Sequence, residues 1–203
     1  MGKSVVELGG AMSNGLLAIA KWRGSEVVAV DYSPSAIEAT KRMFAHNNCQ
    51  VNCICSDFFK VEGKFDLVTH WGVLEHQVDP FPLIELSVKL CNPGGYVMFS
   101  MPQMRGPAAW HWRHKYPENW NHHIYHSDQS IRDSFVRLGL KCKRAFWGPP
   151  MIRITGYEPT APADWMLSRL QFWANQIDRF SFSPYHFGMP WFSMARGFIA
   201  RVS

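Results

Sequence analysis

The sequence predicts a doubly wound α/β fold, in which helices cover both faces of a mostly parallel sheet of seven strands. Apolar, β-branched runs alternate with helical patterns over the first two thirds of the chain. The runs are continuously apolar, as is typical of strands that are covered on both faces. Right-handed crossovers between such strands place the helices on both sides of the sheet.

The elements follow from these runs in chain order. The expected strands cover residues 3–8, 26–31, 50–55, 65–71, 96–101, 141–147 and 194–203. The expected helices cover residues 14–21, 33–47, 80–90 and 127–140, and residues 91–95 are expected to form a turn. Ser33 is a natural N-cap before Pro34, and Ser127 and Asp128 are capping candidates for the last of these helices.

Two long segments break the alternation. Residues 102–126 are rich in tryptophan and histidine and show little periodicity. Residues 148–190 carry prolines at both ends around one amphipathic helix, expected at about residues 164–179. Because long insertions in a compact domain usually shape a binding site, we expect a single domain over residues 1–203 with two substrate-shaping insertions.

Composition narrows the class of protein. The chain is 47% hydrophobic and 18% charged, which suits a folded domain with a real core. No apolar run has the length of a membrane span, and the N-terminus lacks a signal-peptide layout. The five cysteines are odd in number, which favours reduced thiols over disulfides. We therefore expect a cytoplasmic protein that makes no use of a membrane. The net charge of +5 permits a nucleic-acid partner, but no dense basic block favours one.

The stretch "ELGGAMSNG" lies between the first expected strand and its helix. Such a turn brings backbone N–H groups and the positive end of a helix to a ligand, although a plain tight turn explains it about as well. Asp31 ends the next strand, where an acidic residue is placed to bind a ribose diol. A dinucleotide is disfavoured, because Ala11 stands where G-x-G-x-x-G requires its second glycine.

Two further strand ends carry suitable groups. Asp57 and Phe58 follow the third strand and are suited to the edge and face of an adenine ring. Trp71 ends the fourth strand and Gly72 follows it. Ligands of open α/β sheets bind outside the carboxyl ends of the strands, so four such ends predict one site.

These segments together resemble the class I S-adenosylmethionine-dependent methyltransferases, in their ubiquinone-biosynthesis-like and natural-product branch. The resemblance runs through "ELG", "VD", "SDF", "FDLVTHWGVLEHQVDP", "LCNPGGYVMFSMP" and "FVRLGLKCKRAFWG". It implies a Rossmann-like sheet and methyl transfer from S-adenosylmethionine, which leaves S-adenosylhomocysteine. The expected cofactor contacts are Glu7, Gly9, Gly10, Ser13, Asn14, Asp31, Tyr32, Asp57, Phe58, Trp71 and Gly72.

The chain departs from the family in two places. The family pattern E-x-G-x-G-x-G reads Glu7, Gly9, Ala11 and Ser13, and Ala11 fits only with a negative φ. Ser13 and Asn14 are expected to hydrogen-bond the methionine carboxylate instead. The family's helical segment before the first strand has no counterpart here. Either the chain is a fragment, or the insertions and a second subunit in a homodimer cover the site.

Methyl transfer needs alignment, and a base only where the acceptor must lose a proton. Histidine suits a base at neutral pH, and His76 is the first candidate because it follows the fourth strand. His126 is the second candidate, and a bond to the backbone is the plainer role for His76. The expected substrate contacts in the first insertion are Arg105, Trp110, His122 and His123. No metal site is expected there, because cysteines are absent and carboxylates are scarce.

The leading interpretation is transfer of a methyl group to an oxygen or nitrogen of a small-molecule acceptor. Methylation of RNA or protein is the alternative, because aromatic residues beside Arg and Lys can stack on bases. A second alternative is a binding or scaffold protein that has lost turnover. Cofactor affinity separates the scaffold from the enzymes.

Overall fold

The computed structural model describes residues 3–147 and 195–203. The expected helix at residues 164–179 lies outside this range. The chain divides into two units. The first unit comprises Met1–Phe99, His126–Lys143 and Ile199–Ser203, and the second comprises Ser100–Tyr125 and Arg144–Phe198. That the whole chain is one domain stays a prediction.

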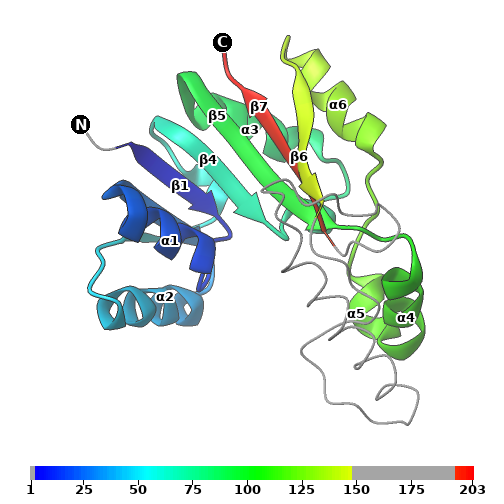
Figure 1. Cartoon of the computed structure of the whole chain (residues 1–203), viewed down its shortest axis with the longest axis horizontal. Coiled ribbons are helices and arrows are strands. Elements are labelled where there is room, and N and C mark those ends of the chain that lie inside the picture. Colours follow the sequence, from blue (N-terminus) through cyan, green and yellow to red (C-terminus); the bar gives the residue numbers. More distant parts are fainter. Residues whose placement is uncertain (1–2, 148–194) are drawn as a thin grey trace, which may run out of the picture. The chain divides into compact units, whose positions relative to one another are not determined.

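The sheet confirms the predicted fold class. The strands of the described residues form one seven-stranded sheet in the order β3-β2-β1-β4-β5-β7-β6 (Figure 1). Their bounds are β1 Ser4–Leu8, β2 Glu26–Asp31, β3 Asn52–Cys55, β4 Phe65–Trp71, β5 Cys91–Pro102, β6 Cys142–Trp147 and β7 Ala195–Arg201. β1 pairs in parallel with β2 and β4, and β2 pairs in parallel with β3. The crossovers between these strands bring their carboxyl ends to one edge.

The start of β5 differs from the expected turn at residues 91–95, because the strand already begins at Cys91. Gly94 N–H donates to Val202 at 2.8 Å, and Val202 N–H donates back to Gly95 at 3.0 Å. The beginning of β5 thus pairs with the residue just after β7, so that the two strands run antiparallel. This long-range pairing leaves no local signal in the sequence.

The helices begin largely where capping residues predict. Their bounds are α1 Asn14–Arg23, α2 Pro34–His46, α3 Phe81–Leu90, α4 Pro107–Lys115, α5 Pro117–Asn121 and α6 Asp128–Arg137. The short 3-10 helices are η1 Phe58–Lys60 and η2 Leu74–His76. The hydroxyl groups of Ser13, Ser33 and Ser127 each accept a backbone N–H at the start of α1, α2 and α6.

Helices cover both faces of the sheet in the first unit (Figure 1). On one face, Val5 and Ala29 pack in a core cluster with Leu16 of α1 and Phe44 of α2. On the other face, the ring of His70 stacks on Phe99 at 4.7 Å between ring centroids, and Phe99 lies parallel to Phe135 of α6 at 6.1 Å. The sheet is therefore buried on both sides where the strands read as continuously apolar.

The first insertion, residues 102–126, was expected to be irregular, but it contains the helices α4 and α5. Each helix starts at a proline, where the missing N–H costs no hydrogen bond. The indole N–H of Trp112 donates to the Asn119 side chain at 2.8 Å, and the Trp112 ring packs edge-on against Trp120. Packing between aromatic rings, rather than an amphipathic period, holds this hairpin.

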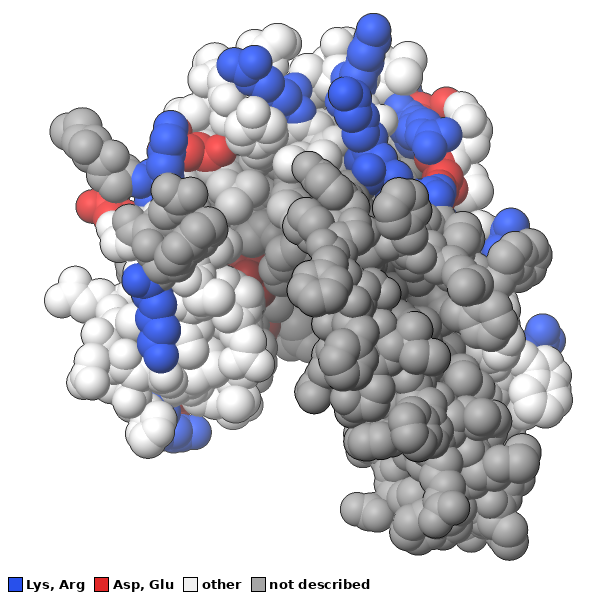
Figure 2. Space-filling model, viewed as in Figure 1, with Lys and Arg blue, Asp and Glu red and all other residues white. Residues whose placement is uncertain are grey.

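Three features of the structure bear on the expectations drawn from composition: helix length, the cysteines and the surface charges. No helix among the described residues is long and apolar enough to cross a membrane. All five cysteines are free thiols, but only Cys91 among them is buried, whereas the sequence predicts that they are buried in apolar runs. Figure 2 shows Lys and Arg side chains mixed with Asp and Glu along the upper edge of the described surface, and the described residues on this face form no single basic patch.

Candidate functional site

The end of β1 carries a buried carboxyl group. Glu7 is 2% exposed, and its Oε2 accepts a hydrogen bond of 2.8 Å from the Ser13 hydroxyl. The indole of Trp71, at the end of β4, also donates to this carboxyl group. Burial raises the pKa of Glu7 to about 7, and these two bonds oppose that rise. Glu7 therefore joins β1, β4 and the start of α1.

The glycine-rich turn is closely packed. Gly9 has φ +70°, and a Cβ atom there would lie 2.7 Å from Cγ2 of Val73. Only glycine fits both the left-handed backbone and this contact. Met12 also has a positive φ of +50°, whereas Ala11 does not, which is the condition under which alanine replaces glycine. The turn therefore keeps its shape without the family's second glycine.

A cavity of about 300 Å³ lies against this turn. Its lining residues come from the ends of β1 and β4 and the start of α1, and they are Glu7, Gly9, Ala11, Ser13, Asn14, Gly15 and Trp71. Five of the predicted cofactor contacts are among them. The positive end of α1 and a buried carboxyl group thus face the same small volume.

Ser13 lines this cavity, and its hydroxyl group already donates one hydrogen bond and accepts another within the protein. The oxygen accepts from Leu16 N–H at 3.0 Å, and the hydrogen goes to Glu7. A ligand carboxylate that bonded Ser13 would have to break the bond to Glu7. The predicted contact of Ser13 with the cofactor stays a prediction, and the structure gives Ser13 a role in holding Glu7.

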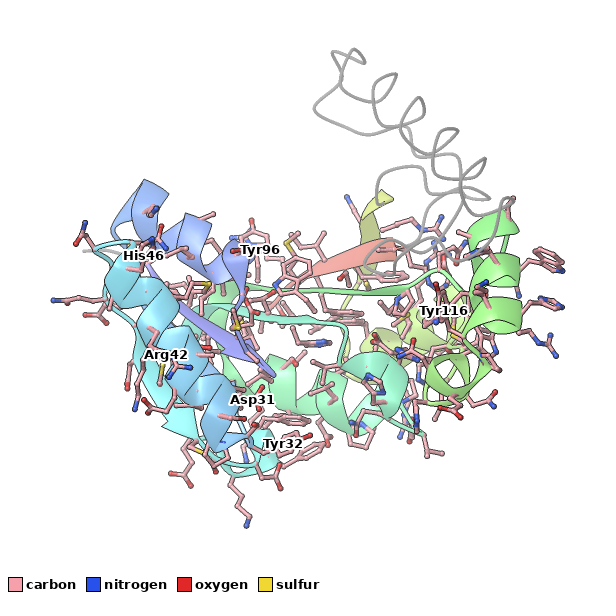
Figure 3. All side chains as sticks on the ribbon, turned by 90° about the horizontal axis from the view of Figure 1, so that it is seen from below. Asp31, Tyr32, Arg42, His46, Tyr96 and Tyr116 are labelled. Carbon is pink, nitrogen blue, oxygen red and sulfur yellow. The ribbon has the colours of Figure 1, made fainter. Side chains whose placement is uncertain are left out.

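The acidic residue at the end of β2 adjoins the glycine turn. Gly9 N–H donates to Val30, next to Asp31, at 2.8 Å. Asp31 is 8% exposed, and its Oδ1 accepts from Ser33 N–H at 2.9 Å, which fixes the carboxylate at the start of α2. Figure 3 shows Asp31 and Tyr32 side by side at that end of α2, and Tyr32 is exposed.

The end of β3 lies beside Asp31. Ser56 N–H donates to the Asp31 carbonyl at 3.0 Å. Asp57 caps η1 by accepting from Phe59 N–H at 3.0 Å, and the rings of Phe58 and Phe59 are 4.8 Å apart. The ends of β4, β1, β2 and β3 therefore line one edge in that order. The sequence predicts that these four ends share an edge, but not their order.

The segment after β4 forms the other wall. Gly72 has φ +68°, and a Cβ atom there would lie 3.3 Å from Oε1 of Glu75. Glu75 is buried, its Oε2 has no hydrogen-bond partner among the described residues, and burial raises its pKa to about 7. His76 is exposed at the end of η2, and its backbone N–H donates to the Val73 carbonyl.

His126 lies against this same segment. Its Nε2 is 3.2 Å from the Leu74 carbonyl and 3.0 Å from the Gln77 carbonyl, so this nitrogen carries hydrogen and donates to both. His126 is 6% exposed. A base must offer a lone pair, and Nε2 does not. The catalytic role predicted for His126 stays a prediction, while the geometry makes it a clamp on η2.

The predicted substrate contacts lie in the second unit. Trp110 is exposed on α4, with its ring tilted over His114. His122 follows α5, and His123 bonds the Asn119 carbonyl at 2.8 Å and packs edge-on against Trp112. The guanidinium of Arg105 lies 4.7 Å from the centre of the Tyr125 ring. Their roles toward a substrate stay predictions.

A larger cavity, of about 750 Å³, lies elsewhere, at the amino ends of β2 and β3, where Glu26, Lys41 and Asn52 are among its lining residues. Size alone favours it. Parallel sheets bind ligands at the opposite edge, however, where the helix N-termini and the polar strand ends converge. We therefore assign the site to the smaller cavity.

At this site, two buried polar residues are absent from the sequence-based predictions. Thr69 is the register partner of Glu7, it is 1% exposed, and its hydroxyl has no partner among the described residues. Glu75 is the second. Alternation along β4 places Thr69 on the face of Glu7, which is a signal that was available. The burial of Glu75 follows from the packing of η2 and had no such signal.

The comparisons agree with this geometry. A family model described as a methyltransferase domain matches residues 1–144. The ubiquinone biosynthesis O-methyltransferase of Coxiella burnetii is 36% identical over 104 residues, which are 49% of this chain and 43% of that relative. That of Xanthomonas campestris pv. campestris is 31% identical over 113 residues, 53% and 46% of the two chains. The chain thus spans less than half the length of these relatives.

A solved structure shares the fold. The magnesium protoporphyrin IX methyltransferase of Synechocystis PCC 6803, crystallised with SAM, matches with a TM-score of 0.61 at 15% identity. The match covers 100% of this chain and 71% of that one. At this identity the likeness concerns the fold alone, and the family model carries the assignment. The chain belongs to the class I S-adenosylmethionine-dependent methyltransferases.

Proposed function

We propose that the protein transfers a methyl group from S-adenosylmethionine to an oxygen or nitrogen of a small-molecule acceptor. The observation that carries the proposal is the cavity between Glu7, the glycine turn and the start of α1, beside the carboxylate of Asp31. The similarity to O-methyltransferases of ubiquinone biosynthesis supports a small acceptor. No observation favours RNA or protein as the acceptor, or a scaffold role.

The residues present fit the cofactor. Asp31 would accept hydrogen bonds from the ribose hydroxyls, because a carboxylate has capacity beyond its bond to Ser33. Tyr32 and Phe58 offer ring faces to the adenine. The cavity near Gly9 would hold the methionine part, and Glu7 would supply a carboxylate for its positive charges. When bound, the cofactor supplies a methyl group attached to a positively charged sulfonium sulfur. The bond between the methyl carbon and that sulfur breaks in the reaction, and S-adenosylhomocysteine is the leaving group.

The chain's part in the reaction is alignment and proton removal. We assign the proton from the acceptor hydroxyl or amine to His76, which is exposed on η2 directly after the Gly72 turn. His126 holds η2 through hydrogen bonds to the carbonyls of Leu74 and Gln77. The proton leaves the acceptor as its oxygen or nitrogen forms the bond to the methyl carbon, so charge balances.

We infer a cytoplasmic location for this activity. The five free cysteines support a reducing compartment, where exposed thiols such as Cys55 persist. The homodimer predicted from the sequence stays a prediction.

The test is calorimetric titration of the protein with S-adenosylmethionine and, separately, with S-adenosylhomocysteine. We expect both to bind, and Asp31→Ala to weaken binding by about a hundredfold, because two charge-assisted hydrogen bonds are lost. Asp31→Asn keeps an acceptor for Ser33 N–H and so separates loss of charge from loss of structure.

Asp133→Ala on α6 is the matched control, since it removes an exposed carboxylate away from the strand ends and should bind like the unsubstituted protein. Absence of binding to either ligand would refute the enzyme and move the scaffold interpretation to first place.

A further inference from the structure

A buried hydroxyl group in the interior of β4 is unused by the fold. Thr69 is 1% exposed, and its Oγ1 makes no hydrogen bond with any of the described residues. A hydroxyl group offers one donor and two acceptor sites, and burying it with none of them in use costs stability. Such groups are rare in folded proteins, so the hydroxyl of Thr69 calls for an explanation.

Thr40, on α2, shows how the same protein treats another buried threonine. Its hydroxyl accepts the N–H of Met12 at 2.9 Å and donates to the carbonyl of Ala36 at 2.9 Å. Thr40 is also fully buried, yet its hydrogen bonds hold the glycine turn to α2. The hydroxyl of Thr69 has no comparable role in the fold.

Register places Thr69 beside Glu7. The two residues are partners in the parallel pairing of β1 and β4, so their side chains project to the same face of the sheet. Trp71, two residues further along β4, projects to this face too, and its indole donates to Glu7. His70 faces the other way, where its ring stacks on Phe99. Thr69 therefore shares its face with two residues that line the cofactor cavity.

Glu7 is the group on this face that can use a further donor. Its carboxyl group accepts from Ser13 and Trp71, and burial disfavours its ionised form, because the pKa is raised to about 7. Each donor favours the ionised form. A carboxylate has about four acceptor sites, so two bonds leave room for a third. Neighbouring strands lie about 4.8 Å apart, which puts the hydroxyl of Thr69 within reach after rotation of either side chain.

We propose that Thr69 is a positioning residue for the cofactor: its hydroxyl donates to the ionised carboxylate of Glu7, which binds the ammonium group of the methionine part. The proposal rests on the proposed function, because it needs S-adenosylmethionine in the cavity beside the glycine turn. Ser13 and Trp71 hold Glu7 from the start of α1 and the end of β4. Thr69 adds a donor from deeper in β4.

The first experiment replaces the hydroxyl of Thr69 by a methyl group. Without cofactor, Thr69→Val should raise the urea midpoint of unfolding, because an unused buried hydroxyl is removed. In calorimetric titration it should weaken the binding of S-adenosylhomocysteine by about tenfold, because Glu7 loses a charge-assisted hydrogen bond. Thr69→Ala also lacks the hydroxyl and should weaken binding equally. A role in the fold alone would instead lower the midpoint and leave the affinity unchanged.

Thr69→Ser tests rescue, because it keeps the hydroxyl and loses only the methyl group. It should retain most of the affinity. Ser87→Ala is the matched control, since Ser87 is a fully buried residue of α3 whose hydroxyl donates to the Leu83 carbonyl at 2.7 Å. Its affinity for S-adenosylhomocysteine should equal that of the unsubstituted protein. If Thr69→Ser binds as weakly as Thr69→Val, the hydroxyl is not the group that matters and the proposal is wrong.

Two further titrations test whether Thr69 acts through Glu7. In a Glu7→Gln background, Thr69→Val should weaken binding by no more than about twofold, because the amide carries no charge for the hydroxyl to stabilise. 5′-Methylthioadenosine lacks the amino-acid group, so its affinity should be the same in Thr69→Val and in the unsubstituted protein. A tenfold loss in the Glu7→Gln background, or an equal loss for both ligands, would overturn the proposal.

Failure of this proposal is distinct from failure of the proposed function. If the unsubstituted protein binds S-adenosylhomocysteine and Thr69→Val binds it equally well, Thr69 has no positioning role and methyl transfer stands. If the unsubstituted protein binds neither S-adenosylmethionine nor S-adenosylhomocysteine, the proposed function is refuted, and the role of Thr69 with it.

Discussion

Glu7 shows how one residue ties cofactor binding to pH. Its carboxyl group is protonated in part at neutral pH, because burial raises the pKa to about 7. A cationic cofactor favours the ionised form. Below pH 7 a proton must leave before binding, so the affinity for S-adenosylmethionine should fall by up to about tenfold per pH unit. Titrations at a series of pH values check this expectation.

Glu7→Gln should flatten this pH profile, because the amide does not titrate. Glu75→Gln is the matched control, since Glu75 is also buried with a pKa of about 7 but does not line the cavity. If the pH dependence persists in Glu7→Gln and disappears in Glu75→Gln, the titrating group is Glu75 and the assignment to Glu7 is wrong.

His70 makes the stability of the fold depend on pH, also on the acidic side of neutrality. It is fully buried, neither ring nitrogen has a partner among the described residues, and burial lowers its pKa to about 3. Its neutral form is favoured by folding, so stability is complete above the unfolded pKa of about 6.5 and falls by up to about 1.4 kcal/mol per pH unit below it.

His70→Phe should remove this loss, because phenylalanine keeps the stacking on Phe99 without a titrating group. Denaturant unfolding at mildly acidic and neutral pH measures the difference between the variant and the unsubstituted protein. His46→Gln, exposed on α2, serves as control and should leave the acid sensitivity in place. Equal acid sensitivity in His70→Phe would contradict the assignment.

Among the elements, η2 depends on a residue 49 to 52 positions away in the chain. His126 donates to the carbonyls of Leu74, the first residue of η2, and Gln77, its C-cap. His126→Ala should cost about 1–3 kcal/mol of stability, because it leaves these carbonyls without their donor. It should also weaken cofactor binding, since Val73 contacts the glycine turn.

His126→Gln places an amide N–H near the position of Nε2 and should retain most of both properties. Unfolding and cofactor titration of the two variants measure this rescue. If alanine and glutamine behave alike, the clamp is not the role of His126, and its predicted role as a base regains weight.

The strands and most helices were predictable because their signals are local. The serine caps before α2 and α6 and the apolar runs of β2 and β4 each follow from a few neighbouring residues. α4 was missed because Trp112 and its aromatic neighbours stabilise it through packing rather than through an amphipathic period. The early start of β5 was missed because it depends on Val202.

The candidate site was predictable to the level of residues but not of bonds. Sequence order places Glu7, Ser13 and Trp71 at one edge, yet it does not reveal that they hydrogen-bond one another. Outside this site, the burial of Arg196 was missed, because an arginine in a C-terminal strand carries no signal of burial. Its environment comes from Met101 and Tyr125, far away in the sequence.

At the scale of the whole molecule, the two cavities compete for the assignment of the cofactor. Hydrogen exchange with and without S-adenosylhomocysteine distinguishes them. We expect slower exchange of backbone amides at residues 9–15, 32–33, 57–59 and 71–73, which border the carboxyl edge of the strands. The amides at residues 24–28 and 49–52, around the larger cavity, should be unaffected. Protection confined to these last residues would move the binding site to the amino edge.

The contact between Gly9 and Val73 bears on how such sequences diverge. With 2.7 Å between a Cβ at position 9 and Cγ2 of Val73, the two positions cannot drift independently. A lineage that acquires alanine or serine at position 9 has to lose volume at position 73, and the positive φ makes even that exchange costly. Substitutions of Val73, which follows β4, are therefore constrained by Gly9, which follows β1. Across relatives, small side chains at 73 should mark the lineages in which position 9 is free to vary.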